Sequence, residues 1–206
     1  MSLRDKIREN RRQYGTLGCT VRILHFLLRQ FGIVWERFYY LEKELTSDTA
    51  KITNHTPHKV KELTFDDFRK GDASFFTDAK LSYIKNILAD KTYVPYGIII
   101  DGKLAYSAWI SLKRLPLPYG FELTLNDHEG ALLDDYCMPE FRRQGLHSEV
   151  LKYRLKQLYM QNKKQSVVVI LTSNRPALKA EMKAGFKTVK KFTILKIFNK
   201  KKMIWK

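Results

Sequence analysis

The hexapeptide Ser-Val-Val-Val-Ile-Leu at residues 166–171 limits the fold more than any other stretch of this chain. Its valine, isoleucine and leucine side chains occupy both faces of a strand, which is typical of a central parallel strand covered by helices on both sides. The sequence around it predicts helices over 147–161 and 175–184 and strands over 131–138 and 186–198. This alternation of strand and helix predicts an α/β unit with a right-handed crossover.

The middle of the chain adds an antiparallel hairpin and a helix. Strands expected over 96–100 and 104–112 flank the pair Asp101-Gly102, the commonest kind of two-residue hairpin turn. Apolar residues at helical spacing predict a helix over 78–88. Residues 113–127 contain two prolines and are expected to be loop-rich.

The N-terminal region has a different pattern. Apolar residues follow a 4-3 spacing over residues 1–40, so we expect helix there, divided into two by Gly15 and Gly18. The sequence therefore predicts a basic amphipathic helical extension over 1–45, a polar linker over 46–58 and a domain over 59–206. The broad apolar face of the extension could pack on its own domain, on a second copy in a homodimer, on a membrane surface or beside a nucleic acid.

Charge is distributed unevenly along the 206 residues. The 38 lysines and arginines exceed the 21 aspartates and glutamates by 17. Residues 1–40 contribute +5 and residues 41–140 contribute −4, whereas residues 141–206 contribute +16. Such a field attracts anions, which include nucleic acid, anionic lipid and phosphorylated cofactors.

Several classes of protein are disfavoured. Cys19 and Cys137 form neither a disulfide framework nor a CxxC pair, and the five histidines lack the spacing of metal ligands. No run of 18 apolar residues occurs, so we expect neither a signal peptide nor a membrane-spanning helix, and we expect a cytoplasmic protein.

A basic turn lies between the strand over 131–138 and the helix that follows it. It reads Pro-Glu-Phe-Arg-Arg-Gln-Gly-Leu-His over residues 139–147. The first amides of a helix have no intrahelical acceptor, and the helix dipole adds partial positive charge there. Because Gly145 lets the backbone approach an anion closely, the turn is a candidate phosphate site. The alternative is an ordinary turn with solvated arginines.

These residues resemble the signature of the GNAT superfamily of acyl-CoA-dependent N-acetyltransferases. The run from Arg142 to His147 follows a strand and a proline, and Asn174 and the pair Gly185-Phe186 follow in the family's order. The resemblance is close over 129–189 and loose over 58–200. It implies an α/β fold with a GNAT-like mixed central sheet flanked by helices and an acetyltransferase domain over 59–206. The N-terminal helical segment predicted from the apolar spacing would be an extra element beside that fold.

The resemblance also implies a binding site for acetyl-CoA as co-substrate, without a metal. The pyrophosphate would bind the amides from Arg143 to Ser148, pantetheine would pair with the strand backbone in a crevice between splayed strands around 136 and 170, and an amide near Cys137 would stabilise the oxyanion. The cofactor-binding residues would be Cys137, Met138, Arg142, Arg143, Gln144, Gly145, Leu146, His147, Ser148 and Asn174. His147 stands where the family usually has Gly or Ala, and its imidazole could reach toward phosphate or simply begin the helix.

Asp134 and Asp135 are the candidate catalytic bases. Adjacent strand residues point to opposite faces, so only one of them can face the cleft. Its function would be to take a proton from the ammonium of the acceptor, directly or through water. The alternative is an acidic residue held by a nearby arginine. Glu181 occupies the position where the family often has a tyrosine that protonates the leaving thiolate, and we assign Glu181 no role.

The function predicted from the sequence is transfer of an acetyl or other acyl group from the CoA thioester to a small-molecule or peptide amine by direct attack in a ternary complex. The alternative is a basic nucleic-acid-binding or membrane-surface module that has a CoA-binding but inactive GNAT-like fold. Nucleic acid is disfavoured because the sequence contains no recognition-helix or zinc-finger pattern. Membrane contact through residues 1–40 would make the protein peripheral to the membrane. The identity of the acceptor, a hydroxyl acceptor and the oligomeric state stay open.

Overall fold

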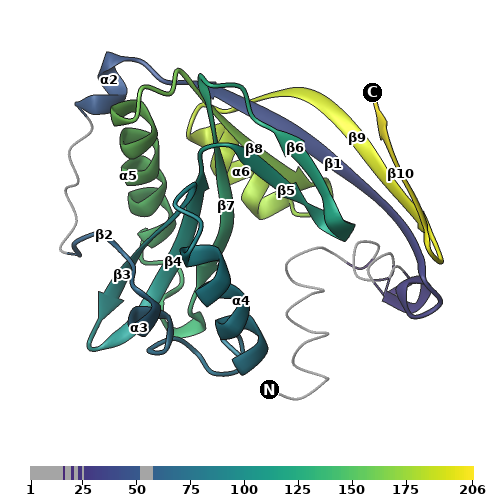
Figure 1. Cartoon of the computed structure of the whole chain (residues 1–206), viewed down its shortest axis with the longest axis horizontal. Helices are drawn as coiled ribbons and strands as arrows, with labels where there is room; N and C mark the ends of the chain where they lie inside the picture. Colours follow the sequence, from purple (N-terminus) through teal and green to yellow (C-terminus); the bar gives the residue numbers. More distant parts are fainter. Residues whose placement is uncertain (1–15, 17–19, 21–22, 25, 52–57) are drawn as a thin grey trace. The chain divides into compact units, whose positions relative to one another are not determined.

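The computed structural model describes residues 16, 20, 23–24, 26–51 and 58–206 (Figure 1). The chain divides into two compact units: unit 1 comprises residues 1–42 and 169–206, and unit 2 comprises residues 43–168. Among the described residues, no helix combines the length and the apolar character needed to cross a bilayer.

Unit 2 contains most of the secondary structure. Its helices are α2 (Ser47–Ala50), α3 (Phe65–Phe68), α4 (Asp78–Leu88) and α5 (Leu146–Met160), with 3-10 turns at Pro118–Gly120 and Pro139–Phe141. Its strands are β2 (Lys61–Glu62), β3 (Tyr93–Ile100), β4 (Lys103–Ser111), β5 (Arg114–Leu117), β6 (Phe121–Thr124), β7 (Glu129–Cys137) and the first part of β8 (Gln165–Leu171).

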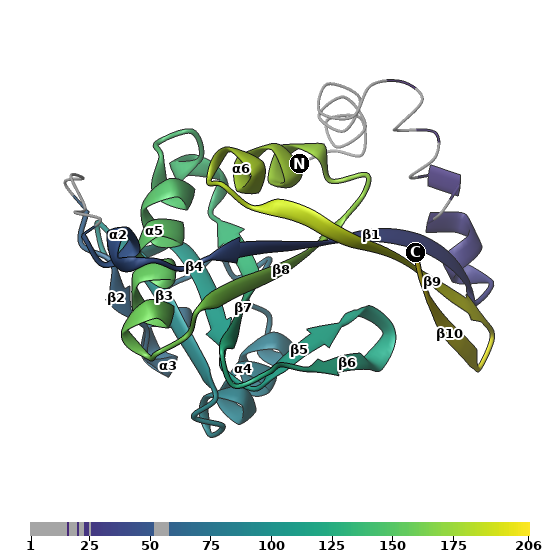
Figure 2. The same cartoon turned by 90° about the horizontal axis from the view of Figure 1, so that it is seen from above.

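The strands of unit 2 form a mixed sheet. The order is β8-β7-β4-β3-β2, in which β7 and β8 are parallel and the other neighbours are antiparallel. Helix α5 packs on one face of β3, β4 and β7, and α3 and α4 lie over the other face (Figures 1 and 2). The expected α/β class with a mixed sheet flanked by helices is confirmed.

Two apolar layers hold these helices. On the α4 side, the core cluster consists of Leu63, Phe68, Phe76, Ile84, Leu104 and Trp109. On the α5 side, Val150, Leu151, Leu155 and Leu158 are buried. Gly130 of β7 allows the close approach of α5, because a Cβ at Gly130 would lie 2.3 Å from a methyl carbon of Leu158. The position of α5, and with it the turn that begins it, therefore depends on a small residue in β7.

Unit 1 is a smaller antiparallel arrangement. It contains β1 (Ile33–Glu44, apart from its last two residues), the end of β8, α6 (Arg175–Lys183), β9 (Lys187–Ile197) and β10 (Lys200–Trp205). The strand order is β10-β9-β1-β8. Residues 23, 24 and 26–30 are helical and lead through Gly32, which has a φ of +72°, into β1.

Three expectations need correction. The predicted helix over 1–40 is wrong for residues 33–40, which belong to β1; residues 1–15, 17–19, 21–22 and 25 lie outside the described residues. In β1 the buried side chains alternate at Val34, Glu36, Phe38 and Tyr40, and this two-residue period prevailed over the 4-3 spacing once β9 was present to pair with it.

The other two corrections are local. The expected linker over 46–58 contains the single-turn helix α2, while residues 52–57 lie outside the described residues. The expected loop over 113–127 is instead the hairpin of β5 and β6, in which Leu115 pairs with Leu123. The division into an extension, a linker and a domain otherwise stays a prediction.

Candidate functional site

The turn that begins α5 contains two residues with left-handed backbone conformations. Arg143 and Gly145 both have left-handed backbone conformations, with φ values of +69° and +81°. Gly145 is the N-cap, and nothing lies within 4 Å of the position of its absent Cβ. The first amides of α5, from Leu146 onward, have no intrahelical acceptor and lie beside the positive end of the helix dipole. The turn therefore combines open space at Gly145 with the positive polarity of a helix N-terminus, the combination found in anion sites.

The side chains of this turn separate into inward and outward groups. Leu146 is buried and anchors the turn in the core, whereas Arg143 and Ser148 are exposed. The Arg142 guanidinium Nε donates to the Cys137 carbonyl at 3.4 Å, and the Gln144 amide donates to the Glu140 carbonyl at 3.4 Å. These two hydrogen bonds connect the turn to the end of β7 and to the 3-10 turn that follows it, and they use side chains rather than the amides of the turn.

Within the described residues of unit 2, β7 has a free edge on its β8 side after Ala131. The parallel ladder of β7 with β8 pairs Glu129, Gly130 and Ala131 only. The Met138 amide donates to the Ala105 carbonyl at 3.0 Å, and Cys137 lies opposite Tyr106 on β4. In this antiparallel pattern the peptide groups of Cys137 point away from β4. Of the two expected backbone partners for pantetheine, Cys137 therefore has outward-facing peptide groups, and Met138 has its amide already bonded.

Both candidate bases lie in a β-bulge of β7. The register between β4 and β7 shifts between Ser107 and Trp109, and Asp134 has a φ of +46°. The Asp134 carboxylate lies on the α4 side, 3.5 Å from the Lys80 ammonium, and it is 57% exposed. The expectation that only one of the two aspartates faces a given side of the sheet agrees with this geometry.

Asp135 faces α5 and is held by three groups. The Tyr106 hydroxyl donates to its Oδ1 at 2.7 Å, and the Arg154 guanidinium donates to the same atom at 2.6 Å. The His147 Nδ1 is 2.7 Å from the Tyr106 hydroxyl oxygen and 3.8 Å from Asp135. Because the hydroxyl hydrogen is committed to the carboxylate, the Nδ1–H of His147 donates to Tyr106.

Arg154 explains why Asp135 is fixed. Its side chain is fully buried, and it also donates to the carbonyls of Trp109 at 3.1 Å and Leu133 at 3.5 Å. These two carbonyls flank the bulge, so the guanidinium supplies hydrogen bonds that the irregular ladder cannot. Asp135 neutralises this buried charge, which assigns it a structural role.

Burial shifts the pKa values of the two aromatic members of this network. It raises the pKa of Tyr106 well above its usual value, and the Asp135 carboxylate adds to that shift. Burial also lowers the pKa of His147, partly offset by Asp135 and reinforced by Arg154. His147 is therefore neutral at pH 7 and points toward Tyr106, so its direction does not favour the alternative of an imidazole reaching for phosphate.

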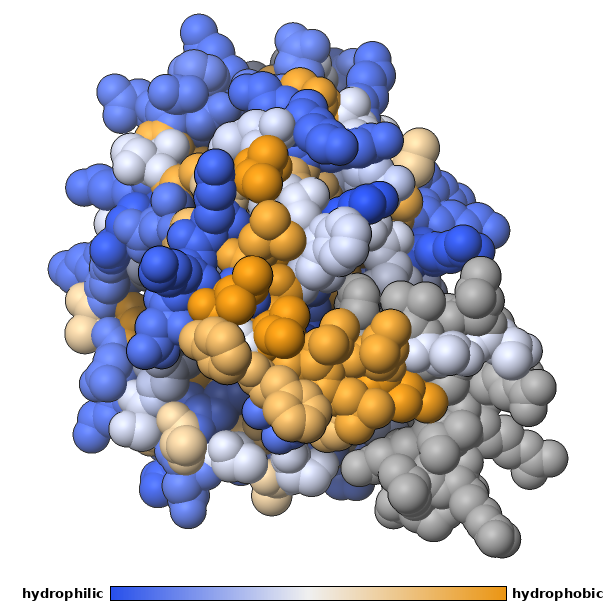
Figure 3. Space-filling view, turned by 90° about the vertical axis from the view of Figure 1, so that its right-hand side faces the viewer, coloured by the Kyte–Doolittle hydropathy of each residue, from blue (hydrophilic) through white to orange (hydrophobic). Residues whose placement is uncertain are grey.

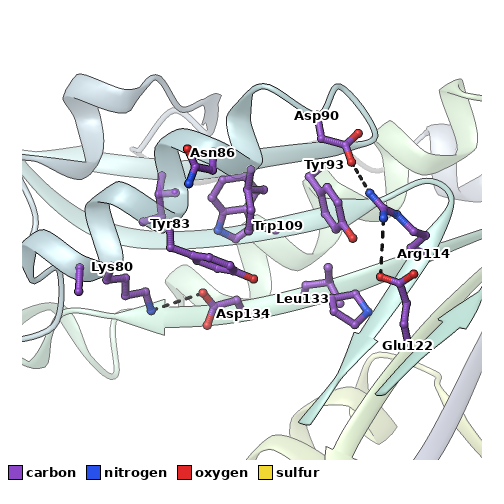
Figure 4. A pocket seen from close by; sticks show the side chains of 14 residues that line it. Lys80, Tyr83, Asn86, Asp90, Tyr93, Trp109, Arg114, Glu122, Leu133 and Asp134 are labelled. Carbon is purple, nitrogen blue, oxygen red and sulfur yellow. Dashed lines mark hydrogen bonds and ion pairs between the residues drawn. The ribbon is translucent and has the colours of Figure 1, made fainter. Parts of the chain in front are cut away.

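A cavity of about 830 Å³ opens on the α4 side of β7 (Figure 4). Its size suits a small organic molecule. It is lined by Ala79, Lys80, Tyr83, Ile84, Asn86, Ile87, Asp90, Tyr93, Trp109, Arg114, Pro116, Glu122, Leu133 and Asp134. The Trp109, Tyr83 and Tyr93 rings form an aromatic middle between two polar ends (Figure 4).

The polar ends of the cavity carry paired charges. At one end Lys80 faces Asp134; at the other, Arg114 lies 2.5 Å from Asp90 and 3.9 Å from Glu122 (Figure 4). Three acidic and two basic side chains therefore line the cavity, which leaves an excess of one negative charge. The Lys80 ammonium also lies 3.6 Å from the centre of the Phe75 ring, an aromatic partner for a positive charge outside the cavity lining.

Two other sequence-derived candidates have local structural roles. The half-buried Cys137 thiol donates to the Met138 carbonyl, and burial raises its pKa, which disfavours the thiolate needed by a nucleophile. In unit 1, the Asn174 side chain caps α6 by accepting from the Ala177 amide at 3.4 Å. Glu181 is a buried residue of α6. A cofactor contact by Asn174 stays a prediction.

Three residues central to this site were not identified from the sequence: Lys80, Tyr106 and Arg154. Arg154 lies on the inner face of its helix, four residues after Val150 and three after Leu151, both of which are buried. A charged residue on an apolar helix face indicates a buried partner, and this pattern could have pointed to Arg154. Tyr106 and Lys80 have no comparable sequence pattern.

No protein-family model and no curated protein sequence matches the chain. Solved structures do match it. A GNAT-family protein from Novosphingobium aromaticivorans has a TM-score of 0.56 at 14% identity over 79% of this chain, and a GNAT-family acetyltransferase from Colwellia psychrerythraea has 0.55 at 15% over 86%. The chain spans 65% and 62% of the lengths of these two proteins.

A third structure shares the fold and contains a cofactor analogue. It is AAC(6')-Iy in complex with the bisubstrate analogue CoA-S-monomethyl-acetylneamine, with a TM-score of 0.50 at 14% identity over 64% of this chain and 92% of that one. These similarities show that the chain has the fold of GNAT acetyltransferases.

Proposed function

We propose that the chain transfers an acyl group from acyl-CoA, with acetyl-CoA as the first candidate, to an amine held in the cavity beside α4. The observation that carries the proposal is the α5 turn, whose helix-start amides and left-handed Arg143 and Gly145 follow a strand with a free edge. The GNAT fold supports it, because in AAC(6')-Iy the same fold is found with a CoA-containing analogue.

The CoA pyrophosphate would bind the amides from Arg143 to Ser148, with the exposed guanidiniums of this turn beside it. The absence of a side chain at Gly145 gives the phosphate oxygens room, since that position is open. Leu146, buried beneath the turn, would keep the amides in place when the anion binds.

The pantetheine arm would lie along the free edge of β7. The outward amide of Cys137 would then donate to the thioester oxygen and stabilise the negative charge that develops there. The Met138 amide donates to the Ala105 carbonyl, so Met138 would hold the end of β7 in place rather than bond to pantetheine. The Cys137 thiol would take no covalent part.

The acceptor amine would enter the cavity so that its nitrogen lies near Asp134. Its ammonium would displace Lys80 from Asp134, and Lys80 would keep its position over the Phe75 ring. Asp134 would take a proton from the ammonium, directly or through a water molecule. The freed amine would attack the thioester carbonyl carbon, so that the C–N bond forms and the C–S bond breaks. The thiolate would leave with the electron pair, and the second proton of the attacking nitrogen would pass through solvent to the thiolate, which leaves a neutral amide and a thiol.

The nature of AAC(6')-Iy's analogue, which joins CoA to an acetylated neamine, supports an amine as the acceptor class. The negative excess of the cavity lining supports a cationic acceptor, and the aromatic middle supports one with an apolar or ring-shaped body. Asp135 would act only as a positioning residue, through Arg154 and the carbonyls that flank the bulge.

The test begins with thermal unfolding of the full chain in increasing acetyl-CoA, with inorganic phosphate and a short DNA duplex as controls. A ligand at 100 times its Kd stabilises by about 2.7 kcal/mol, which is about 5–10 °C for a chain of this size. We expect a saturating shift with acetyl-CoA that persists in moderate salt. A panel of primary amines is then assayed for thiol release. No shift with acetyl-CoA, or a shift that DNA reproduces and salt abolishes, would contradict the proposal.

A further inference from the structure

Unit 1 has an exposed apolar surface that the proposed acyl transfer does not involve. The β9–β10 turn and the start of β1 together present Phe31, Ile33, Trp35, Leu195, Ile197 and Phe198, which we call the apolar tip. Phe31, Trp35, Ile197 and Phe198 are 70%, 55%, 57% and 67% exposed. Figure 3 shows hydrophobic side chains gathered in one broad area of this side of the molecule.

Backbone contacts hold the parts of the tip together. The Phe198 amide donates to the Gly32 carbonyl at 2.9 Å, and the Phe198 ring lies 3.6 Å from where a Cβ on Gly32 would be. Phe31 directly precedes Gly32, so the end of the N-terminal helix and the β9–β10 turn meet at one place. The preceding helical residues Ile23 and Leu27 are also about half exposed.

The sheet arranges apolar residues and lysines in rows. Trp35 lies opposite Leu195, which lies opposite Lys202 on β10. In the next row Ile33 lies opposite Ile197, which lies opposite Lys200. Residues directly opposite one another share a face of a sheet. Each row therefore has two apolar side chains followed by a lysine.

The charge beside the apolar tip has a single sign. Residues 187–206 contain eight lysines and no aspartate or glutamate. Three of these lysines, Lys200 to Lys202, follow the turn directly and line a groove of about 600 Å³ together with Ile197 and Phe198. Lysine stems can lie along apolar surface while their ammonium groups reach polar surroundings.

From this arrangement we infer that the apolar tip docks on an anionic lipid membrane surface. Aromatic and aliphatic side chains would enter the boundary between headgroups and acyl chains, while the lysines would contact anionic headgroups. This is the combination by which peripheral proteins lie on a membrane. The inference does not depend on acyl transfer, because every residue that carries it belongs to unit 1.

The charge and the side-chain types of the tip favour a membrane over two other candidate occupants, a second copy of the chain and a nucleic acid. A symmetric contact with a second copy would bring two lysine-rich tips together, and residues 187–206 offer no acidic partner for them. Nucleic acid would satisfy the lysines, but the aliphatic Ile33, Leu195 and Ile197 cannot stack on bases as aromatic rings do. An anionic bilayer satisfies both the charged and the apolar parts of the tip.

The test is co-sedimentation of the full chain with vesicles of phosphatidylcholine, with and without phosphatidylglycerol. We expect binding only where phosphatidylglycerol is present. Phe198 has a φ of +54°, a conformation that asparagine tolerates, so Phe198→Asn removes the ring while suiting the turn. Phe198→Asn and the pair Lys200→Gln/Lys202→Gln should each weaken binding about ten-fold or more.

Matched controls come from α6 in the same unit. Met182 is 55% exposed, so Met182→Gln repeats the loss of an exposed apolar side chain, and Lys179→Gln/Lys183→Gln repeats the loss of two exposed charges. Neither control should change vesicle binding. Circular dichroism and thermal unfolding establish that each variant is folded before it is compared.

Tryptophan quenching by lipids brominated in the acyl chain reports insertion directly. Of the three tryptophans, Trp35 belongs to the tip, Trp109 is buried, and Trp205 packs on Phe192 at the end of β10 away from the turn. We therefore expect quenching that Trp35→Phe reduces strongly. Binding that survives Phe198→Asn without quenching would overturn the inference in favour of simple charge adsorption. So would an absence of binding at low salt. Self-association or DNA binding that the tip variants abolish, with vesicle binding unaffected, would identify a second copy or a nucleic acid as the occupant instead.

Discussion

Asp134 and Asp135 are adjacent in β7, yet their carboxylates face opposite sides of the sheet. The Asp134 carboxylate is 3.5 Å from the Lys80 ammonium at the edge of the α4 cavity. The Asp135 carboxylate accepts from Tyr106 and from the buried Arg154 on the α5 side. Adjacent strand residues normally point to opposite faces, and the two aspartates keep this division although a bulge lies at their position in β7.

Replacing Asp134 should affect the reaction and leave the fold intact. In the proposed mechanism, Asp134→Asn removes the proton acceptor, so thiol release from acetyl-CoA with the best amine of the panel should fall about 10²–10⁴-fold. Because the carboxylate is more than half exposed, the free energy of unfolding should change by less than about 0.5 kcal/mol. The thermal shift produced by acetyl-CoA should be retained. Asp127→Asn, at an exposed aspartate in a loop, is the control; full activity in Asp134→Asn would exclude it as the base.

The Asp135–Arg154 pair should be energetically coupled. Asp135→Asn leaves a buried guanidinium without its counter-charge, and we expect a loss of about 2–4 kcal/mol in unfolding free energy, since the carboxylate is partly exposed; Arg154→Met should cost about 3–5 kcal/mol. A double-mutant cycle from urea unfolding should give a coupling above about 1 kcal/mol. The exposed pair Lys103–Glu140, 3.0 Å apart, is the matched control and should couple by less than that. Equal couplings in the two cycles would contradict a structural role for Asp135.

Two glycine substitutions distinguish the effect of backbone strain on stability from an effect on acetyl-CoA binding. Gly145 and Gly102 have φ values of +81° and +76°, and neither has an atom within 4 Å of its missing Cβ. Gly145→Ala and Gly102→Ala should therefore each destabilise by about 1–2 kcal/mol through left-handed strain alone. Only Gly145→Ala should weaken acetyl-CoA binding, by about ten-fold or more, because its methyl group would occupy the anion site. Calorimetric titration measures this, and equal affinities in the two variants would remove the turn from the cofactor site.

Stability should depend on pH through His147. Burial lowers its pKa in the folded state below the ordinary value of 6.5, so the unfolded chain binds more protons as the pH falls below that value. This group therefore stabilises the fold fully above pH 6.5, and its contribution is lost as the pH falls from 6.5 toward the lower folded pKa. The slope of unfolding free energy against pH from this residue is at most about 1.4 kcal/mol per unit. His147→Gln should reduce the slope, whereas His128→Gln, at an exposed histidine, should leave the contribution of His147 in place.

Local patterns in the sequence were sufficient to predict much of the secondary structure of unit 2. The pair Asp101-Gly102 forms the predicted turn with φ values of +49° and +76°, because these residues tolerate that conformation wherever they occur. The helix expected over 78–88 is α4 with the same bounds. The basic turn at the start of α5 was also predictable, since its glycine and its place between a strand and a helix are properties of consecutive residues.

Residues 33–40 show the limit of prediction from local patterns. Val34, Phe38 and their neighbours fit a helical spacing and a strand alternation almost equally well, and pairing with β9 through contacts such as Phe38 opposite Phe192 decided for the strand. An apolar pattern indicates which side chains avoid water. Whether the backbone is a helix or a strand depends on the partner that buries those side chains.

The sequence by itself therefore determined the order of the later strands and helices, the Asp101-Gly102 turn and the basic turn before α5, because each depends on residues close together in the chain. Only the tertiary structure decided that Asp135 supports and Asp134 faces the cavity. Tyr106, Asp135 and Arg154 come from three elements separated by 19 residues or more, and they meet because α5 packs on β7 above Gly130. Hydrogen bonds over that separation form only after the core has brought their elements together, so no local pattern records them.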